Sequence, residues 1–283
     1  MKKISFEDLN GKVCAITGGA GVIGKAMVKG LASVGIKVAK LDINKEMADK
    51  VAVEVGSESG TQCIGVEANV LDKASLEKAK AEINQKLGKI GMIINGAGGN
   101  HPAATTKQEQ MESNKVPDLD ETFYGLQMEG FQKVFDLNFM GTLLPCLVLS
   151  KDMLEAGKGV ILNISSMNSY KPLTKIPAYS AAKAAINNFT QWLAVHFAKT
   201  GIRVNAIAPG FFLTNQNRFL LIDEKTGEAT ARGKKIINNT PMGRYGEVEE
   251  LQGTTLFLLS DVSQFITGVV IPVDGGYSAF GGV

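Results

Sequence analysis

The sequence has few of the residues that build disulfide frameworks or metal centres. Its 283 residues include 3 cysteines and 2 histidines. The cysteines, Cys14, Cys63 and Cys146, are odd in number, widely spaced and set in apolar stretches. This pattern is typical of buried free thiols in a reducing compartment. We therefore expect neither a disulfide nor a zinc site.

Charge of one sign and long apolar runs are also lacking. The 30 basic residues nearly balance 28 acidic ones, giving a net charge of +2 without a long single-sign run. A nucleic-acid or membrane-surface partner is therefore not expected. No apolar run is long enough to span a bilayer, and the polar segment Met1–Asn10 lacks the apolar core of a signal peptide. We expect a cytoplasmic protein with a small-molecule ligand.

The chain does have the length and the apolar content, 45%, to bury one full core. Short β-rich runs alternate with longer segments of helical period, which predicts a single Rossmann-type α/β domain over residues 1–283, with seven parallel strands doubly wound by helices on both faces. The predicted strands are Lys12–Thr17, Lys37–Leu41, Gln62–Glu67, Ile90–Asn95, Gly159–Ile164, Arg203–Ala208 and Val269–Val273. The predicted helices are Gly24–Val34, Lys45–Val55, Lys73–Leu87, Gly130–Ala156, Pro177–Lys199 and Glu247–Leu259.

Two long segments interrupt this alternation. Gly99–Gly130 follows the fourth predicted strand, and Phe211–Gly246 follows the sixth. In an open α/β sheet, ligands bind beyond the carboxyl ends of the strands, and both segments leave from that edge. We expect them to form the substrate walls, with a lid at about residues 211–246, since loops of this length are usually functional when ordered.

The segment Thr17–Gly24 joins the first predicted strand to the first predicted helix and contains four glycines. Such a turn lets a pyrophosphate approach backbone N–H groups at the positive end of a helix. Asp42, which ends the next strand, would accept hydrogen bonds from the adenosine ribose and repel a 2′-phosphate. This favours NAD(H) over NADP(H), although Asp42 could be a solvated strand end and Lys40 and Lys45 lie close in sequence.

A phenol, an ammonium and a hydroxyl converge in the second half of the chain. Tyr179 and Lys183 are i and i+4 neighbours if Pro177–Lys199 is a helix, and Ser166 lies 13 residues upstream of Tyr179. A nearby cation favours the phenolate, so the pair could move a proton to or from a carbonyl oxygen that Ser166 holds. A Tyr-x-x-x-Lys spacing alone would also suit an ordinary amphipathic helix.

Together these motifs resemble the short-chain dehydrogenase/reductase family over essentially the whole chain. Thr17-Gly18 with Gly24 is similar to the family's cofactor turn, although Val22 stands where the middle glycine is usual and Gly21 lies one place earlier. The resemblance implies a catalytic tetrad of Asn138, Ser166, Tyr179 and Lys183. It also implies the cofactor-binding residues Gly18, Gly21, Val22, Ile23, Gly24, Asp42, Asn69, Val70, Asn95, Ala97, Gly98, Tyr179, Lys183, Pro209, Gly210, Phe212 and Thr214.

The implied reaction is hydride transfer from NADH to a carbonyl carbon while Tyr179 donates a proton to the oxygen. Lys183 would lower the Tyr179 pKa and hold the nicotinamide ribose, Ser166 would polarise the carbonyl, and Asn138 would fix a water. The resemblance also implies a homotetramer, with the helices Gly130–Ala156 and Pro177–Lys199 paired across twofold axes.

The segments Gly98–Pro102 and Pro209–Arg218 more narrowly resemble the D-mannonate oxidoreductase branch of the family, which interconverts D-mannonate and D-fructuronate. A hexuronate needs a cation for its carboxylate and amides for its hydroxyls. The expected substrate contacts are His101, Ser166, Asn217 and Arg218, with Asn100, Asn215 and Gln216 supplying further amides. Arg218 suits the carboxylate because a guanidinium grips it with two hydrogen bonds.

Alternatives remain open at the substrate end. Arg218 could be a solvated loop arginine, and His101 could support a turn. Another sugar-acid or polyol dehydrogenase, such as one resembling gluconate 5-dehydrogenase, or an oxoacyl thioester reductase would share the tetrad. A regulatory protein that binds NAD(H) without catalysis would keep the fold, although such proteins commonly lose the tyrosine or the lysine.

Overall fold

A computed structural model describes residues 4–19, 21–113, 118–214 and 217–282 of the chain. Its seven strands form one parallel sheet, as the sequence predicts, and the structure gives their order as β3-β2-β1-β4-β5-β6-β7. The strands are β1 (Val13–Thr17), β2 (Lys37–Asp42), β3 (Cys63–Glu67), β4 (Met92–Asn95), β5 (Gly159–Ile164), β6 (Ile202–Pro209) and β7 (Val270–Val273). Strands β1, β4 and β5 are buried along their whole length, because helices cover both faces of the sheet.

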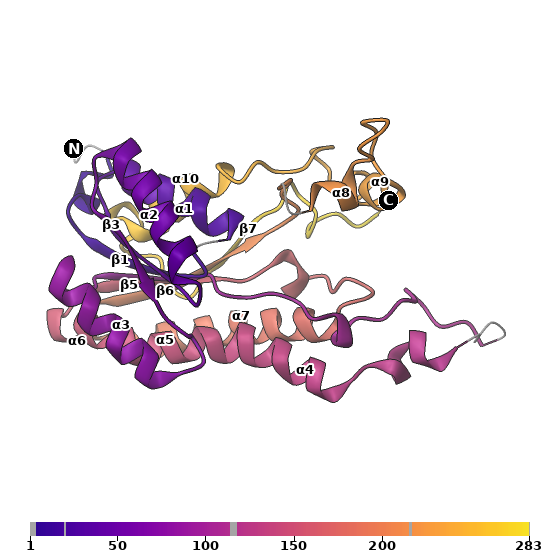
Figure 1. The fold of residues 1–283 in the computed structure, drawn as a ribbon, viewed down its shortest axis with the longest axis horizontal. Helices are drawn as coiled ribbons and strands as arrows, with labels where there is room; N and C mark the ends of the chain where they lie inside the picture. The colour runs from indigo at the N-terminus through magenta and orange to yellow at the C-terminus, as the bar shows by residue number, and fades with distance from the viewer. Residues whose placement is uncertain (1–3, 20, 114–117, 215–216, 283) are drawn as a thin grey trace.

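The helices form two layers (Figure 1). One layer contains α1 (Val22–Ser33), α2 (Lys45–Ser59) and α10 (Glu250–Leu259), and the other contains α3 (Lys73–Lys86), α4 (Met128–Phe135), α5 (Gly141–Leu149), α6 (Lys151–Ala156) and α7 (Pro177–Phe197). Two short helices, α8 (Arg218–Leu221) and α9 (Ala231–Asn238), lie beyond the sheet, near the C-terminus. No helix of the described residues combines the length and apolar character needed to cross a membrane.

Local signals explain the helix ends that the sequence places well. The Asn44 side chain accepts a hydrogen bond from the Met47 N–H at the start of α2, and the Asp72 side chain caps α3 in the same way. Gly60, with φ of 69°, ends α2 in the left-handed conformation. Pro177 begins α7, where its missing N–H costs no hydrogen bond.

The predicted helix Gly130–Ala156 is wrong as one regular helix. A five-residue π-helical turn, η5 (Asp136–Met140), separates α4 from α5, and α6 begins after Ser150. The apolar period runs through all of these elements, so the sequence pattern does not show the extra residue per turn. Such turns are common at functional sites, and this one contains Asn138.

Other boundaries differ by a few residues. Helix α1 begins at Val22 rather than at Gly24, and α10 begins at Glu250 rather than at Glu247. The segment between β4 and α4 extends away from the sheet (Figure 1) and contains three 3₁₀ turns. These are η2 (Pro102–Ala104), η3 (Leu119–Glu121) and η4 (Phe123–Gly125), and the remaining 3₁₀ turns are η1 (Glu7–Leu9), η6 (Met167–Ser169) and η7 (Asp261–Ser263).

Candidate active site

A cavity of about 570 Å³ opens at the carboxyl ends of β1, β4, β5 and β6. The sheet order reverses between β1 and β4, the place where open α/β sheets bind their ligands. Its volume lies within the range of small-molecule sites. We name its two halves after the roles that the sequence predicts for their residues: a nucleotide-binding half at β1, α1 and β2, and a catalytic half at the end of β5 and on α7.

The glycine turn after β1 has the shape that a bound pyrophosphate requires. Gly18 has a φ of 65°, and Gly21 is the N-cap of α1. A Cβ atom on Gly24 would lie 2.5 Å from the Gly18 carbonyl oxygen, so any side chain at this position would force the turn to change shape. The start of α1, where the helix dipole favours an anion, lies at the cavity, which Gly21, Val22, Ile23 and Gly24 line.

Asp42 lines the same half of the cavity and receives a hydrogen bond of 3.1 Å from the Asn44 N–H to its Oδ1. The two lysines near it in sequence are not among the described lining residues. The Lys40 ammonium is buried and donates to the Met47 carbonyl oxygen at 3.2 Å, while Lys45 pairs with Asp49 on α2. Among the described residues that line this half, Asp42 is thus the only charged side chain.

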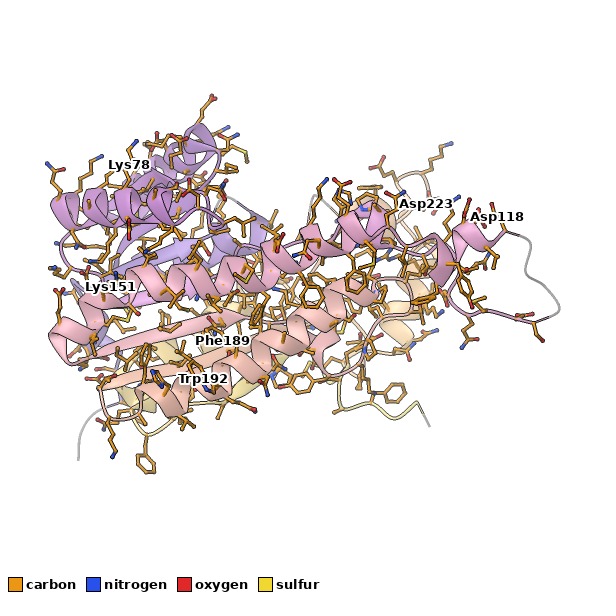
Figure 2. All side chains as sticks on the ribbon, turned by 90° about the horizontal axis from the view of Figure 1, so that it is seen from below. Lys78, Asp118, Lys151, Phe189, Trp192 and Asp223 are labelled. Atoms are coloured by element: carbon orange, nitrogen blue, oxygen red, sulfur yellow. The ribbon has the colours of Figure 1, made fainter. Side chains whose placement is uncertain are left out.

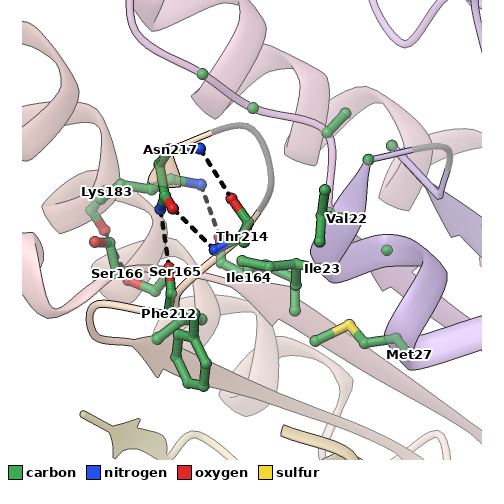
Figure 3. A pocket seen from close by; sticks show the side chains of 18 of the residues that line it. Val22, Ile23, Met27, Ile164, Ser165, Ser166, Lys183, Phe212, Thr214 and Asn217 are labelled. Carbon is green, nitrogen blue, oxygen red and sulfur yellow. Dashed lines mark hydrogen bonds between the residues drawn. The ribbon is translucent and has the colours of Figure 1, made fainter. Parts of the chain in front are cut away.

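Three residues of the predicted tetrad, Ser166, Tyr179 and Lys183, line the catalytic half of the cavity, and Figure 3 labels Ser166 and Lys183. The Lys183 Nζ lies 5.6 Å from the centre of the Tyr179 ring and donates to the Ile164 carbonyl oxygen at 2.8 Å. Ser166 is the N-cap of η6, and its Oγ accepts from the Asn168 N–H at 3.2 Å. Ser166 lies in the loop that follows β5, and Tyr179 and Lys183 lie on α7, so the loop and the helix bring the three side chains to one cavity.

Burial shifts the pKa values of both Lys183 and Tyr179. It lowers the pKa of the Lys183 ammonium from 10.5 to about 8, because the side chain is only 4% exposed. Burial raises the pKa of the Tyr179 phenol, while the Ser166 hydroxyl, acting as a hydrogen-bond partner, lowers it. The role that the resemblance implies for Lys183, lowering the Tyr179 pKa, stays a prediction.

Asn138, the fourth residue of the tetrad, lies beside the cavity and does not line it. Its Nδ2 donates to the carbonyl oxygens of Gly99 and Val134 at 2.7 and 2.8 Å, and its Oδ1 accepts from the Gly99 N–H at 3.2 Å. A Cβ atom on Gly98 would lie 2.6 Å from the Asn138 Oδ1 and 3.2 Å from the Lys183 Nζ. The π-helical turn thus places Asn138 next to Lys183, with Gly98 between them.

The structure brings most of the predicted site residues together. Those that line the cavity are Gly18, Gly21, Val22, Ile23, Gly24, Asp42, Ala97, Gly98, Ser166, Tyr179, Lys183, Pro209, Gly210, Phe212, Thr214 and Asn217. Asn217 also holds the loop above the site together, since its Oδ1 accepts from the Thr214 N–H at 2.8 Å and its Nδ2 donates to the Phe212 carbonyl oxygen at 2.9 Å (Figure 3).

Three predicted cofactor residues do not line the cavity. The Asn95 side chain is buried under the sheet, where its Nδ2 donates to Asn163 Oδ1 at 2.8 Å. Val70 is buried as well, and Asn69 uses its Oδ1 to accept from the Leu71 N–H at 2.9 Å. Their positions in the motifs fit, but their side chains serve local turns and packing.

Two predicted substrate residues also lie outside the cavity. Arg218 is exposed at the start of α8, and its N–H bonds the Thr214 carbonyl oxygen at 2.9 Å. The His101 Nδ1 accepts from the Ala103 N–H at 3.2 Å and supports η2, while Asn100 donates to Thr105 at 2.8 Å. Asn215 and Gln216 fall outside the described residues.

Sequence reasoning missed several lining residues. Gly96, Gly99, Ser165 and Phe211 adjoin predicted positions, so widening each motif by one residue would have found them. Ile16, Met27 and Ile164 carry no such signal, because apolar side chains in a strand or helix are expected to belong to the core. With these seven residues the set of described residues that line the cavity is complete.

Comparisons with known proteins agree with this geometry. Residues 18–278 match the family model for enoyl-(acyl carrier protein) reductase. An uncharacterized oxidoreductase, UxuB, of Bacillus subtilis is 50% identical over 278 residues, 98% of each chain. The chain belongs to the short-chain dehydrogenase/reductase family. It is thus an oxidoreductase of the class that uses a nicotinamide cofactor.

Two further proteins are similar to the chain over nearly its whole length. The crystal structure of a proposed D-mannonate oxidoreductase from Haemophilus influenza, with bound NAD, is 50% identical, has a TM-score of 0.92 and covers 98% of each chain. An NAD-dependent glycerol dehydrogenase of Listeria innocua is 34% identical over 271 residues, 96% of this chain and 95% of the relative.

Proposed function

We propose that this short-chain dehydrogenase/reductase is an NAD(H)-dependent enzyme that interconverts D-fructuronate and D-mannonate. The observation that carries the proposal is that one cavity is lined by Asp42 at one end and by Ser166, Tyr179 and Lys183 at the other. The similarity to the proposed D-mannonate oxidoreductase, whose structure contains NAD, supports both the cofactor and the substrate.

The cofactor assignment follows from the charges of the nucleotide-binding half. The glycine turn and the start of α1 suit a pyrophosphate, and the Asp42 carboxylate suits the two hydroxyls of an unphosphorylated ribose. With Lys40 buried and Lys45 paired with Asp49, neither lysine of this region offers the 2′-phosphate of NADP(H) a cation in the cavity. We therefore infer a preference for NAD(H).

The chemistry follows from the catalytic half. Bound NADH would supply the hydride that reduces the substrate carbonyl carbon. Ser166 can donate a hydrogen bond to the carbonyl oxygen, and Tyr179 can transfer its phenolic proton to the alkoxide that develops there. Lys183, whose pKa of about 8 lies near neutrality, can return a proton to the phenolate. In the direction of alcohol oxidation the same groups act in reverse, with the phenolate of Tyr179 as base.

The carboxylate of a sugar-acid substrate needs a cationic side chain at the edge of the cavity. Among the described residues that line the cavity, Lys183 is the only cationic side chain, and it lies buried at the catalytic end. Arg218 stands four residues after Thr214, which lines the cavity. We propose that residues 211–246 act as a lid, and that a movement of α8 toward the cavity brings the Arg218 guanidinium to the carboxylate.

A polyol dehydrogenase is the runner-up, favoured by the exposed position of Arg218 and by the similarity to the glycerol dehydrogenase. The NADH absorbance should fall when the enzyme meets D-fructuronate and should respond weakly to D-fructose, the neutral ketose. Arg218→Ala should cost about 10-fold or more in kcat/KM on D-fructuronate and little on D-fructose, with the exposed lid arginine changed in Arg232→Ala as control. Equal losses on both substrates would reject the carboxylate role, and a wild-type preference for neutral polyols would favour the runner-up.

We also propose a homotetramer. Helices α5 and α7 expose apolar side chains to solvent, including Leu147, Trp192 and Val195, of which Val195 is 78% exposed. Figure 2 shows Phe189 and Trp192 on α7, where their rings stack with centres 6.3 Å apart. Exposed apolar faces of this kind mark association surfaces. Light scattering should give about four times the mass of the 30.1 kDa chain, and a monomer would reject the proposal.

A further inference from the structure

Asn187 continues the row of functional residues along α7, because it stands four residues after Lys183 and eight after Tyr179. Its side chain does not line the cavity and is partly buried between α7 and the loop after β5. Its Oδ1 accepts from Ser165 Oγ at 2.5 Å, and its Nδ2 donates to Ser169 Oγ at 2.8 Å. One amide therefore holds two hydroxyls at once.

The two serines flank Ser166. Ser169 Oγ donates to the Ser166 carbonyl oxygen at 2.6 Å, so Asn187 reaches the backbone of Ser166 through one hydroxyl. Ser165 Oγ lies 3.3 Å from the Lys183 carbonyl oxygen as well as 2.5 Å from Asn187. The segment that carries Ser166 is thus hydrogen-bonded to α7 on both sides. Ser165 contacts Lys183 and Asn187, and Ser169 contacts Asn187.

Helix α7 packs mainly against β6 and η6, and two hydrogen bonds join it to β5 itself. The Lys183 Nζ donates to the Ile164 carbonyl oxygen at 2.8 Å and, two turns further along α7, the Asn163 Nδ2 donates to the Thr190 Oγ1 at 2.9 Å. Buried amides and hydroxyls need partners in definite directions, whereas apolar side chains tolerate small slips. We therefore expect these polar contacts, together with those of Asn187, to fix the position of α7 relative to β5 and to Ser166.

We propose that Asn187 is a positioning residue that holds Ser166 in register with Tyr179 and Lys183. The inference rests on the proposed function in that Ser166 and Tyr179 act on one substrate carbonyl. It assigns Asn187 no contact with substrate or cofactor. Loss of the amide should displace the Ser166 hydroxyl from the phenol, and a misplacement of about 1 Å in a reacting constellation can cost on the order of 100-fold in rate.

The first test reads the Tyr179 phenol directly and needs no substrate. The chain has 5 tyrosines, so protein labelled with ¹³C at the tyrosine ζ carbon should give few resonances, and Tyr179→Phe identifies the one that matters. Ser166→Ala defines the chemical shift of a phenol that has lost its partner. Asn187→Leu and Ser169→Ala should move the resonance in the same direction, and Ser169→Thr, which keeps the hydroxyl, should restore it.

The matched control is Asn188→Leu, which makes the same change at the exposed neighbouring position of α7. If Asn187→Leu and Ser169→Ala leave the Tyr179 resonance where Asn188→Leu leaves it, the inference is overturned. If Asn187→Leu does not fold, Ser169→Ala decides alone, because it cuts the link to Ser166 and leaves the contact between Ser165 and Asn187.

The second test is kinetic. On D-fructuronate, Asn187→Leu and Ser169→Ala should lower kcat on the order of 10-fold to 100-fold with an unchanged NADH dissociation constant, and Asn188→Leu should not. Retained kcat in both variants would overturn the inference. A wild-type enzyme that reduces no sugar-acid ketone would instead refute the proposed function, and the resonance of Tyr179 would then decide on Asn187 by itself.

Discussion

Replacing Lys183 by methionine measures what the burial of its ammonium costs the folded protein. The lysine has an ordinary pKa of 10.5, which burial lowers to about 8. Because the folded-state pKa is the lower one, the unfolded chain binds the proton more tightly. The penalty is complete below pH 8 and disappears as the pH rises through the unfolded-state pKa, so stability should rise with pH in this window.

The size of the effect follows from the two pKa values. Each unit of difference corresponds to about 1.4 kcal/mol, so the full penalty near pH 7 is about 3 kcal/mol and falls to about 1.4 kcal/mol at pH 9.5. The wild type should therefore gain about 2 kcal/mol relative to Lys183→Met between these pH values. The lost hydrogen bond to the Ile164 carbonyl oxygen costs the variant about the same at every pH, and so it leaves this difference unchanged.

The assay is urea unfolding of the cofactor-free wild type and of Lys183→Met in matched buffers from pH 7 to pH 9.5. The difference in unfolding free energy between the two proteins is the quantity to follow, because every other group titrates in both. The range ends below the titration of Tyr179, whose pKa burial raises. A difference that stays constant over the whole range would refute the reasoning, since it would mean that Lys183 keeps its ordinary pKa in the folded protein.

Two further changes address the nucleotide-binding half. Asp42→Ala should raise the ratio of kcat/KM with NADPH to that with NADH by about 10-fold or more, because it removes the charge that opposes a 2′-phosphate; an unchanged ratio in steady-state assays would refute this role. Gly24→Ala should weaken NADH binding at least about 10-fold in a fluorescence titration, since its Cβ would lie 2.5 Å from the Gly18 carbonyl oxygen, whereas Gly253→Ala in α10, with nothing within 4 Å, should leave binding unchanged. Equal affinities of the two glycine variants would contradict the turn geometry.

The sequence predicts the sheet well because its signals are local. All seven strands are confirmed within one or two residues at their ends, since each is a short run rich in apolar residues. The glycine turn and the Tyr179–Lys183 spacing are equally local, and the structure brings both to one cavity. The sequence pattern is therefore sufficient to predict features that depend on adjacent residues or on one turn of a helix.

The errors arise where several segments meet. The π-helical turn at Asn138 depends on the Gly99 backbone, 39 residues away, and no period in the sequence records that contact. Asn95 follows the expected motif, yet its side chain turns under the sheet to Asn163 on a neighbouring strand. Arg218 lies at the start of a four-residue helix whose placement depends on the whole segment after β6, and it is exposed in the structure.

The central claim is that Tyr179 transfers the proton in an NAD(H)-dependent carbonyl reduction. Its most direct test is Tyr179→Phe, which removes one oxygen and leaves the glycine turn and Asp42 in place. With D-fructuronate as substrate, NADH oxidation should fall by at least about 100-fold while the NADH dissociation constant stays unchanged. Turnover within a few-fold of the wild type would contradict the account.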